Sequence, residues 1–133
     1  MIQFYFLSIF CNAAAGYALL AGDNATESGP RPFALSIHNA VCRFLLGMLS
    51  VVTGGFKLLS AVEGNVPVVG DLLPAITGLG MGGILLYEYH LKNAAPASDE
   101  LFEALLNKHR RRLGMGACLV AALHFIFPYA LFL

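Results

Sequence analysis

Four long apolar stretches, separated by short polar segments, dominate the hydrophobic pattern of this 133-residue chain. They run over residues 2–21, 37–62, 72–91 and 113–132. Each is close to or above the roughly 20 helical residues that cross the hydrocarbon layer of a bilayer. Because backbone groups find no water inside a bilayer, such stretches should form helices rather than strands. The pattern therefore predicts an all-α fold, a single transmembrane domain over 1–133 built as a four-helix bundle.

The first apolar stretch also has features of a secretory signal peptide, since it is apolar and carries small residues near its end. A signal peptide normally begins with a basic region, and no lysine or arginine precedes this stretch. We therefore expect residues 2–21 to be retained as the first span, and cleavage of this segment is the alternative.

The segment before the fourth stretch predicts a short helix of its own. Ser98 is a suitable N-cap, and acidic residues follow it in the first turn, where they favour a helix N-terminus. Leucines then share one face, and the basic run KHRRR at 108–112 ends the segment. This pattern is typical of an amphipathic helix that lies on the cytoplasmic membrane surface and leads into the last span.

Lysines and arginines predict the orientation of the spans, because cytoplasmic segments are enriched in them. If 92–112 is cytoplasmic, alternation of the spans makes 22–36 cytoplasmic as well. Every lysine and arginine except Lys57 then lies on or near the cytoplasmic side, so both termini are expected outside. A second interpretation of the basic run is that it binds anionic lipid headgroups. The residues concerned are Lys108, Arg110, Arg111 and Arg112.

Composition agrees with a membrane protein and excludes several classes of function. Hydrophobic residues make up 58% of the chain and charged residues 12%, against roughly 25% charged in a soluble domain. The net charge of zero offers no basic groove for nucleic acid. Cys11, Cys42 and Cys118 lie far apart and form no C-x-x-C, which argues against a disulfide framework or zinc knuckle. No metal, cofactor or catalytic nucleophile–base set is expected.

Four charged residues lie within or at the ends of the second and third stretches: Arg43, Lys57, Asp71 and Glu88. Charge at such depth usually has a partner or a function. An antiparallel hairpin would pair Arg43 with Glu88 at its cytoplasmic end and Lys57 with Asp71 at its outer end. Two alternatives remain open. The basic side chains could extend to opposite interfaces, or Asp71 could form a proton or cation site.

Small residues line the predicted contact between the second and third spans. On the second span, Gly47 and Gly54 share one stripe with the two basic residues, within about 80° of one another. On the third span, Pro74, Gly78 and Gly82 form a comparable stripe. Since small residues let helices approach closely in a membrane, these two spans are expected to pack tightly.

His124 is the histidine expected at depth within a span, because the other three fall near the cytoplasmic face. A haem held by two histidines needs ligands at matching depth on facing helices, and His124 has no such match. We expect it to bond to a neighbouring helix, with a ligand contact, such as a quinone, or a proton relay as alternatives.

Residues 43–88 resemble the DoxX-like family of small membrane proteins. The resemblance consists of R-x-x-x-G at Arg43 and Gly47, then G-G-x-K ending at Lys57, a loop with Pro67, and a glycine-rich helix ending in Glu88. The resemblance implies a four-helix membrane protein, often attached to redox or quinone-linked membrane systems.

These observations lead us to expect a non-catalytic subunit or accessory of a larger complex in the bacterial cytoplasmic (inner) membrane. The small size and the glycine-rich helix faces favour this function. One alternative is an oligomeric transporter or channel for ions or small solutes that uses Asp71 and Lys57. Another is a lipid- or quinone-modifying enzyme, for which only His124 and Glu88 are candidates. The expected partners are membrane lipid and either other membrane subunits or further copies of this chain.

Overall fold

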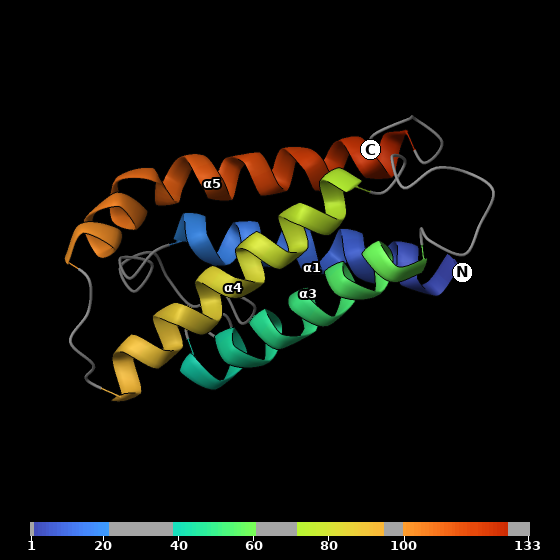
Figure 1. Cartoon of the computed structure of the whole chain (residues 1–133). Coiled ribbons are helices and arrows are strands. Elements are labelled where there is room, and N and C mark those ends of the chain that lie inside the picture. Colours follow the sequence, from blue (N-terminus) through green and yellow to red (C-terminus); the bar gives the residue numbers. More distant parts are fainter. Residues whose placement is uncertain (1, 22–38, 61–71, 95–99, 128–133) are drawn as a thin grey trace.

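The described part of the chain is all-helical. A computed structural model describes residues 2–21, 39–60, 72–94 and 100–127. They form four helices, α1 (Ile2–Ala21), α3 (Ala40–Ser60), α4 (Leu72–Ala94) and α5 (Glu100–Ile126). Figure 1 shows them side by side in one bundle, with the start of α1 and the end of α5 at the same end. The prediction of an all-α fold with four long helices is confirmed.

The separate surface helix predicted before the last span is wrong, because α5 is continuous from Glu100 to Ile126. No proline interrupts this segment, and arginine and leucine at its centre are good helix formers, so nothing ends the helix there. In Figure 1 the orange beginning of α5 bends away from the line of its red part. The predicted N-cap Ser98 lies outside the described residues.

Two close helix pairs make up the bundle, α3 with α4 and α1 with α5. Glycine residues explain how closely α3 and α4 approach each other. A Cβ on Gly82 would lie 2.7 Å from the carbonyl oxygen of Gly47, and a Cβ on Gly54 would lie 2.8 Å from that of Ala75. Real Cβ atoms do not approach that closely, so these helices touch because side chains are missing. The tight packing predicted for this hairpin is confirmed.

The α1–α5 pair uses the same device, which the sequence had not indicated. A Cβ on Gly16 would lie 2.8 Å from the carbonyl oxygen of Gly114, and the reverse distance is also 2.8 Å. Ala117 also contacts this crossing, 3.1 Å from a Cβ at Gly16. Both pairs are therefore held at backbone contact distance by small residues.

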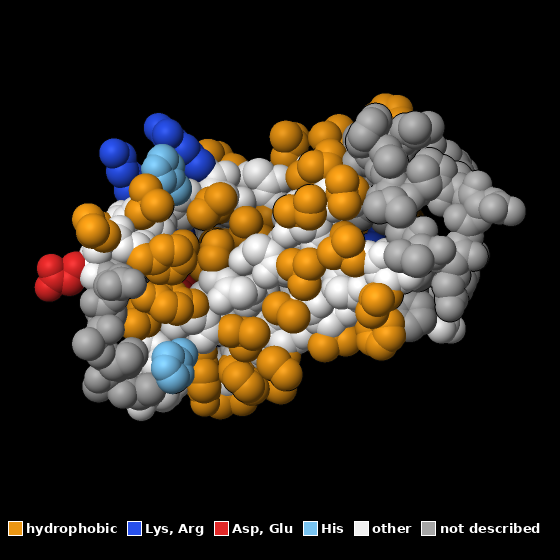
Figure 2. All heavy atoms as spheres, viewed as in Figure 1, with side chains coloured by type: hydrophobic (Ala, Val, Ile, Leu, Met, Phe, Trp, Pro, Cys, Tyr) orange, Lys and Arg blue, Asp and Glu red, His pale blue; other side chains and the backbone are white. Residues whose placement is uncertain are grey.

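The interior holds small and polar side chains, whereas large apolar side chains cover the outside. Alanine is the commonest buried apolar residue, joined by a few larger ones such as Leu19 and Leu85. By contrast, Phe6 is 53% exposed, Leu45 58% and Leu119 61%. Figure 2 shows many orange side chains across the middle of the bundle, with most of the charged side chains in view at one end. Large apolar side chains are therefore exposed on all four helices.

Two of the helices are long and apolar enough to cross a membrane, over Ala40–Leu59 and Leu72–Asn93. The apolar part of α1, Tyr5–Ala21, is shorter. The beginning of α5 is polar and basic. Length and composition thus support two of the four predicted spans.

Candidate functional site

Buried polar residues concentrate where the α3–α4 pair meets the α1–α5 pair. Contacts between the pairs occur at three levels along the bundle. We call these contacts the polar seam and define it by its residues: Arg43, Glu88 and Arg110 at one end, Asn12 in the middle, and Lys57 and His124 at the other end. The seam brings together residues from all four helices.

The charged end of the seam is a cluster of Arg43, Glu88 and Arg110. Arg43 Nη2 lies 2.7 Å from one carboxylate oxygen of Glu88, and Arg110 Nη1 lies 3.3 Å from the other. The side chains of the two ion pairs are 7% (Arg43), 13% (Glu88) and 17% (Arg110) exposed. The predicted contact between Arg43 and Glu88 is therefore present, and it joins α3 to α4. Arg110 extends it to α5.

Both arginines also reach the end of α1. Arg110 Nε donates to the carbonyl oxygen of Leu19 at 3.2 Å, and Arg43 Nη2 donates to that of Ala18 at 3.5 Å. The last carbonyls of a helix lack partners within the helix, and the helix dipole makes this end favourable for cations. The C-terminal turn of α1 thus supplies acceptors that bind two arginines beside a single carboxylate.

The middle of the seam is a hydrogen bond from Asn12 Nδ2 on α1 to the carbonyl oxygen of Pro74 on α4, 3.1 Å long. Asn12 is only 1% exposed. Its side chain lies against Gly78, where a Cβ would be 3.2 Å from Asn12 Oδ1. The glycine therefore makes room for a polar side chain between the helix pairs.

The opposite end of the seam joins Lys57 to His124. Lys57 Nζ lies 2.9 Å from His124 Nε2, and the two residues are 5% and 1% exposed. An ammonium group can only donate, so a charged Lys57 requires Nε2 to accept, which leaves His124 neutral. The predicted bonding of His124 to a neighbouring helix is confirmed.

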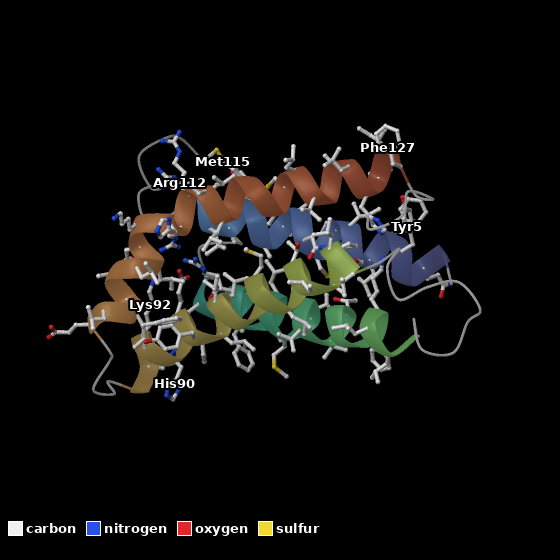
Figure 3. All side chains as sticks on the ribbon, turned by 45° about the horizontal axis from the view of Figure 1, so that its top comes forward. Tyr5, His90, Lys92, Arg112, Met115 and Phe127 are labelled. Carbon is white, nitrogen blue, oxygen red and sulfur yellow. The ribbon has the colours of Figure 1, made fainter. Side chains whose placement is uncertain are left out.

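Tyr5 on α1 completes this end. Its hydroxyl donates to the carbonyl oxygen of His124 at 2.6 Å, its ring lies 4.8 Å from the imidazole, and Lys57 Nζ lies 5.7 Å from the ring centroid. The ring face therefore provides a cation–π contact for the lysine. Figure 3 shows Tyr5 at the end of the bundle opposite Lys92 and His90.

The structure describes the two basic residues of the predicted charged hairpin but not its Asp71. Asp71 lies outside the described residues, so its pairing with Lys57 and a proton site there stay predictions. Neither Arg43 nor Lys57 extends to the surface, since they are 6% and 5% exposed. The structure thus places both basic side chains inside the bundle rather than at its two interfaces.

An apolar layer separates the charged end of the seam from its middle. Its buried residues are Ala15, Ala18, Leu19, Met81, Leu85 and Ala117. A cavity of about 30 Å³ lies beside the charged cluster, lined in part by Arg43, Glu88 and Lys92. A cavity of this size accommodates one or two water molecules. It is too small for an organic substrate.

The basic run on α5 divides into two sets. Lys108, Arg111 and Arg112 are exposed, whereas Arg110 points inward to Glu88. Helical spacing could have revealed this difference, since residue 110 falls on the same face as the buried Leu106 and Ala117. Tyr5 carried no comparable signal, because its contacts depend on how α1 and α5 are paired. Among the described residues, no group of His, Cys, Asp or Glu is arranged to bind a metal.

Comparison with known proteins places the chain in a family without carrying over an activity. A family model of uncharacterised proteins matches residues 1–124. An uncharacterised protein of Treponema pallidum (strain Nichols) is 30% identical over 134 residues, which is 100% of both chains. No solved structure matches the chain.

The resemblance to the DoxX-like family is wrong, because the family model that matches is not DoxX-like. The motif behind it combines glycines with an arginine and a lysine at helix ends. Glycines on a helix face are common wherever two helices pack closely, so a motif built on them has low specificity for one family.

Proposed function

Because the chain belongs to this family of uncharacterised proteins, we propose a function from its own geometry. It is a four-helix membrane protein that acts as a non-catalytic subunit or accessory of a larger membrane complex. Its setting is the bacterial cytoplasmic membrane, with both termini outside.

The surface of the bundle supports residence in a membrane. Large apolar side chains are exposed on every helix, and among the described residues the exposed charges all lie within 92–112. An apolar surface of this kind is unfavourable in water but favourable in lipid. The positive-inside tendency places the end that carries Lys92, Lys108, Arg111 and Arg112 in the cytoplasm. The start of α1 and the end of α5 then lie outside.

The main support for a subunit function is that the buried charged side chains bond to other parts of the bundle. Arg43, Glu88 and Arg110 bond to one another and to backbone carbonyls of α1. They hold helices together, and the cavity that the described residues form beside them has a volume of only about 30 Å³. Buried charges in membrane proteins either pair structurally or mark a pathway, and this cluster fits the first class. Recognition is then left to the outer surface.

The outer surface has sites where another helix could approach closely. A Cβ on Gly80, Gly83 or Gly116 would meet nothing within 4 Å among the described residues. Exposed glycines weaken a helix without contributing to packing inside the bundle. In membranes, small residues on an outer face are typical of contacts with further helices. These glycines therefore support a partner in the membrane plane.

The membrane part of the proposal is tested by extracting cell membranes at alkaline pH. We expect the chain to stay with the lipid pellet, because its apolar surface cannot be transferred to water. Release of the chain into the soluble fraction, with a known integral protein retained, overturns residence in the membrane.

The subunit function is tested by cross-linking in cells, purification in mild detergent and mass spectrometry. We expect one other membrane protein at a fixed ratio to this chain. Gly83→Leu should remove the partner without lowering the melting temperature, since its new side chain points into open space. An isolated chain or a homo-oligomer as the end product contradicts the subunit function.

An oligomeric transporter or channel is the second candidate, favoured by one observation. Lys57 and His124 are two titratable side chains in contact inside the bundle. The apolar layer around Leu85 separates them from the charged end. A pathway through one copy would have to open this layer, so the transporter requires either several copies or a rearranged bundle.

A further inference from the structure

We infer that residues 101–112, near the beginning of α5, form a binding site for anionic phospholipid headgroups, an inference that rests on the proposed membrane residence. Lys108, Arg111 and Arg112 contact the phosphates, and Leu101 and Leu105 contact the adjoining acyl chains. Arg110 takes no part in binding, because it is committed to Glu88 and to α1.

One exposed stripe of α5 carries the main residues of this site. At 100° per residue, Leu101, Leu105, Lys108 and Arg112 fall within about 60° of one another. Leu101 is 87% exposed and Leu105 is 56% exposed. Lys108 and Arg112 are exposed as well, with Arg111 beside them. Apolar and cationic side chains therefore lie on the same exposed face of α5.

Further along α5, the same stripe becomes apolar again. Met115 is 49% exposed and Leu119 is 61% exposed. In a membrane these residues lie in the hydrocarbon layer, which places Lys108 and Arg112 at the level of the headgroups. Figure 1 shows that α5 bends where its orange beginning departs from the red part. In the inferred site, this bend keeps the beginning of α5 close to the membrane surface.

Contacts on the opposite face of α5 hold this segment in place. Arg110 bonds to Glu88 and to the Leu19 carbonyl. The rings of Phe102 and Tyr87 meet edge to face with centroids 5.1 Å apart, and Leu106 is buried. The segment is therefore ordered before lipid arrives, which lowers the entropy lost on binding.

Charge favours an anionic lipid over a neutral one. Among the described residues, the exposed charged side chains are four bases and one acid: Lys92, Lys108, Arg111, Arg112 and Glu100. Figure 2 shows that most of the charged side chains in view gather at this end of the molecule. A basic residue near an anionic leaflet strengthens binding by about fivefold. Apolar residues alternating with this basic group match a lipid surface better than a soluble acidic protein.

The test uses the full chain in nanodiscs that contain equal amounts of phosphatidylcholine and phosphatidylglycerol. The chain is released into a mass spectrometer, and the two retained lipids are counted. We expect phosphatidylglycerol to be enriched well over tenfold, since each of the three basic residues contributes about fivefold. Arg112→Gln should reduce the enrichment about fivefold. The triple variant Lys108→Gln, Arg111→Gln, Arg112→Gln should abolish the enrichment.

Glu100→Gln is the matched control, since it changes one exposed charge at the same end and should leave or raise the enrichment. Absence of enrichment in the unaltered chain, or full enrichment in the triple variant, overturns the inference. Loss of enrichment in millimolar inorganic phosphate also overturns it, because the site would then be specific for the free anion. Release from membranes at alkaline pH is a different result, and it would contradict membrane residence itself.

Discussion

Contacts within the helix pairs and contacts between them are built on different principles. Within a pair, Gly47 meets Gly82 and Gly16 meets Gly114 at backbone contact distance. Between the pairs, Arg43, Lys57 and Asn12 reach across to carbonyls and side chains of the other pair. The glycine contacts set how closely the two helices of a pair approach. The polar contacts set how the two pairs are placed against each other. In the membrane setting proposed above, where the hydrophobic effect does not hold helices together, both kinds of contact are needed.

The largest effect is expected from Glu88→Ala, which breaks the polar seam at its charged end. Two buried arginines would lose their shared carboxylate, and an uncompensated buried charge costs about 3–5 kcal/mol. We expect a large fall in the melting temperature in detergent. Glu100→Ala is the control, since exposed Glu100 should change stability by less than about 0.5 kcal/mol. Equal melting of the two variants would show that the seam is not what joins the pairs.

Gly82→Leu tests the contact within the α3–α4 pair. Its Cβ alone would lie 2.7 Å from both the Gly47 carbonyl oxygen and a methyl carbon of Val51. Because backbone must move to make room, we expect a loss of about 3 kcal/mol of stability. Gly83→Leu, one residue away and facing open space, should be tolerated. A denaturant titration of both variants measures the difference, and similar midpoints would contradict the proposed close crossing.

A double-mutant cycle between Lys57→Met and His124→Phe tests the other end of the seam. Their side chains are in direct contact at 2.9 Å, so their effects on stability should not add. We expect a coupling free energy of about 1–2 kcal/mol. Additive losses would mean that Lys57 relies mainly on groups other than His124. A parallel cycle between Lys57→Ala and Asp71→Asn tests the ion pair that remains a prediction.

The smallest effect is expected at Asn12, in the middle of the seam. Asn12→Ala removes the hydrogen bond to the Pro74 carbonyl, and such bonds between membrane helices contribute about 0.6 kcal/mol on average. Thermal unfolding should show a small fall in stability. If Asn12→Ala lost as much stability as Glu88→Ala, the middle of the polar seam would contribute as much to stability as its charged end.

Local patterns were sufficient to predict the helices and one contact of the site. Hydrophobic runs predicted four helices, and the glycine spacing predicted the tight α3–α4 hairpin. Arg43 and Glu88 could be matched because a short connection leaves neighbouring helices antiparallel, which sets their levels. The surface helix was predicted separately because the basic run resembled a boundary. A change of polarity alone does not end a helix, and α5 continues through the basic run and through Gly114 and Gly116.

Sequence alone determined that the chain forms four long helices and that small residues line the contact between α3 and α4, since these features depend on nearby residues. The tertiary structure decided which helices pair and therefore which charges meet. Arg110 joined Glu88, and Tyr5 joined Lys57 and His124, because α5 lies against α1. Residues 119 positions apart, such as Tyr5 and His124, come into contact only through that pairing. The physical reason is that helix periodicity specifies which side of a helix is buried, but not which neighbour covers it.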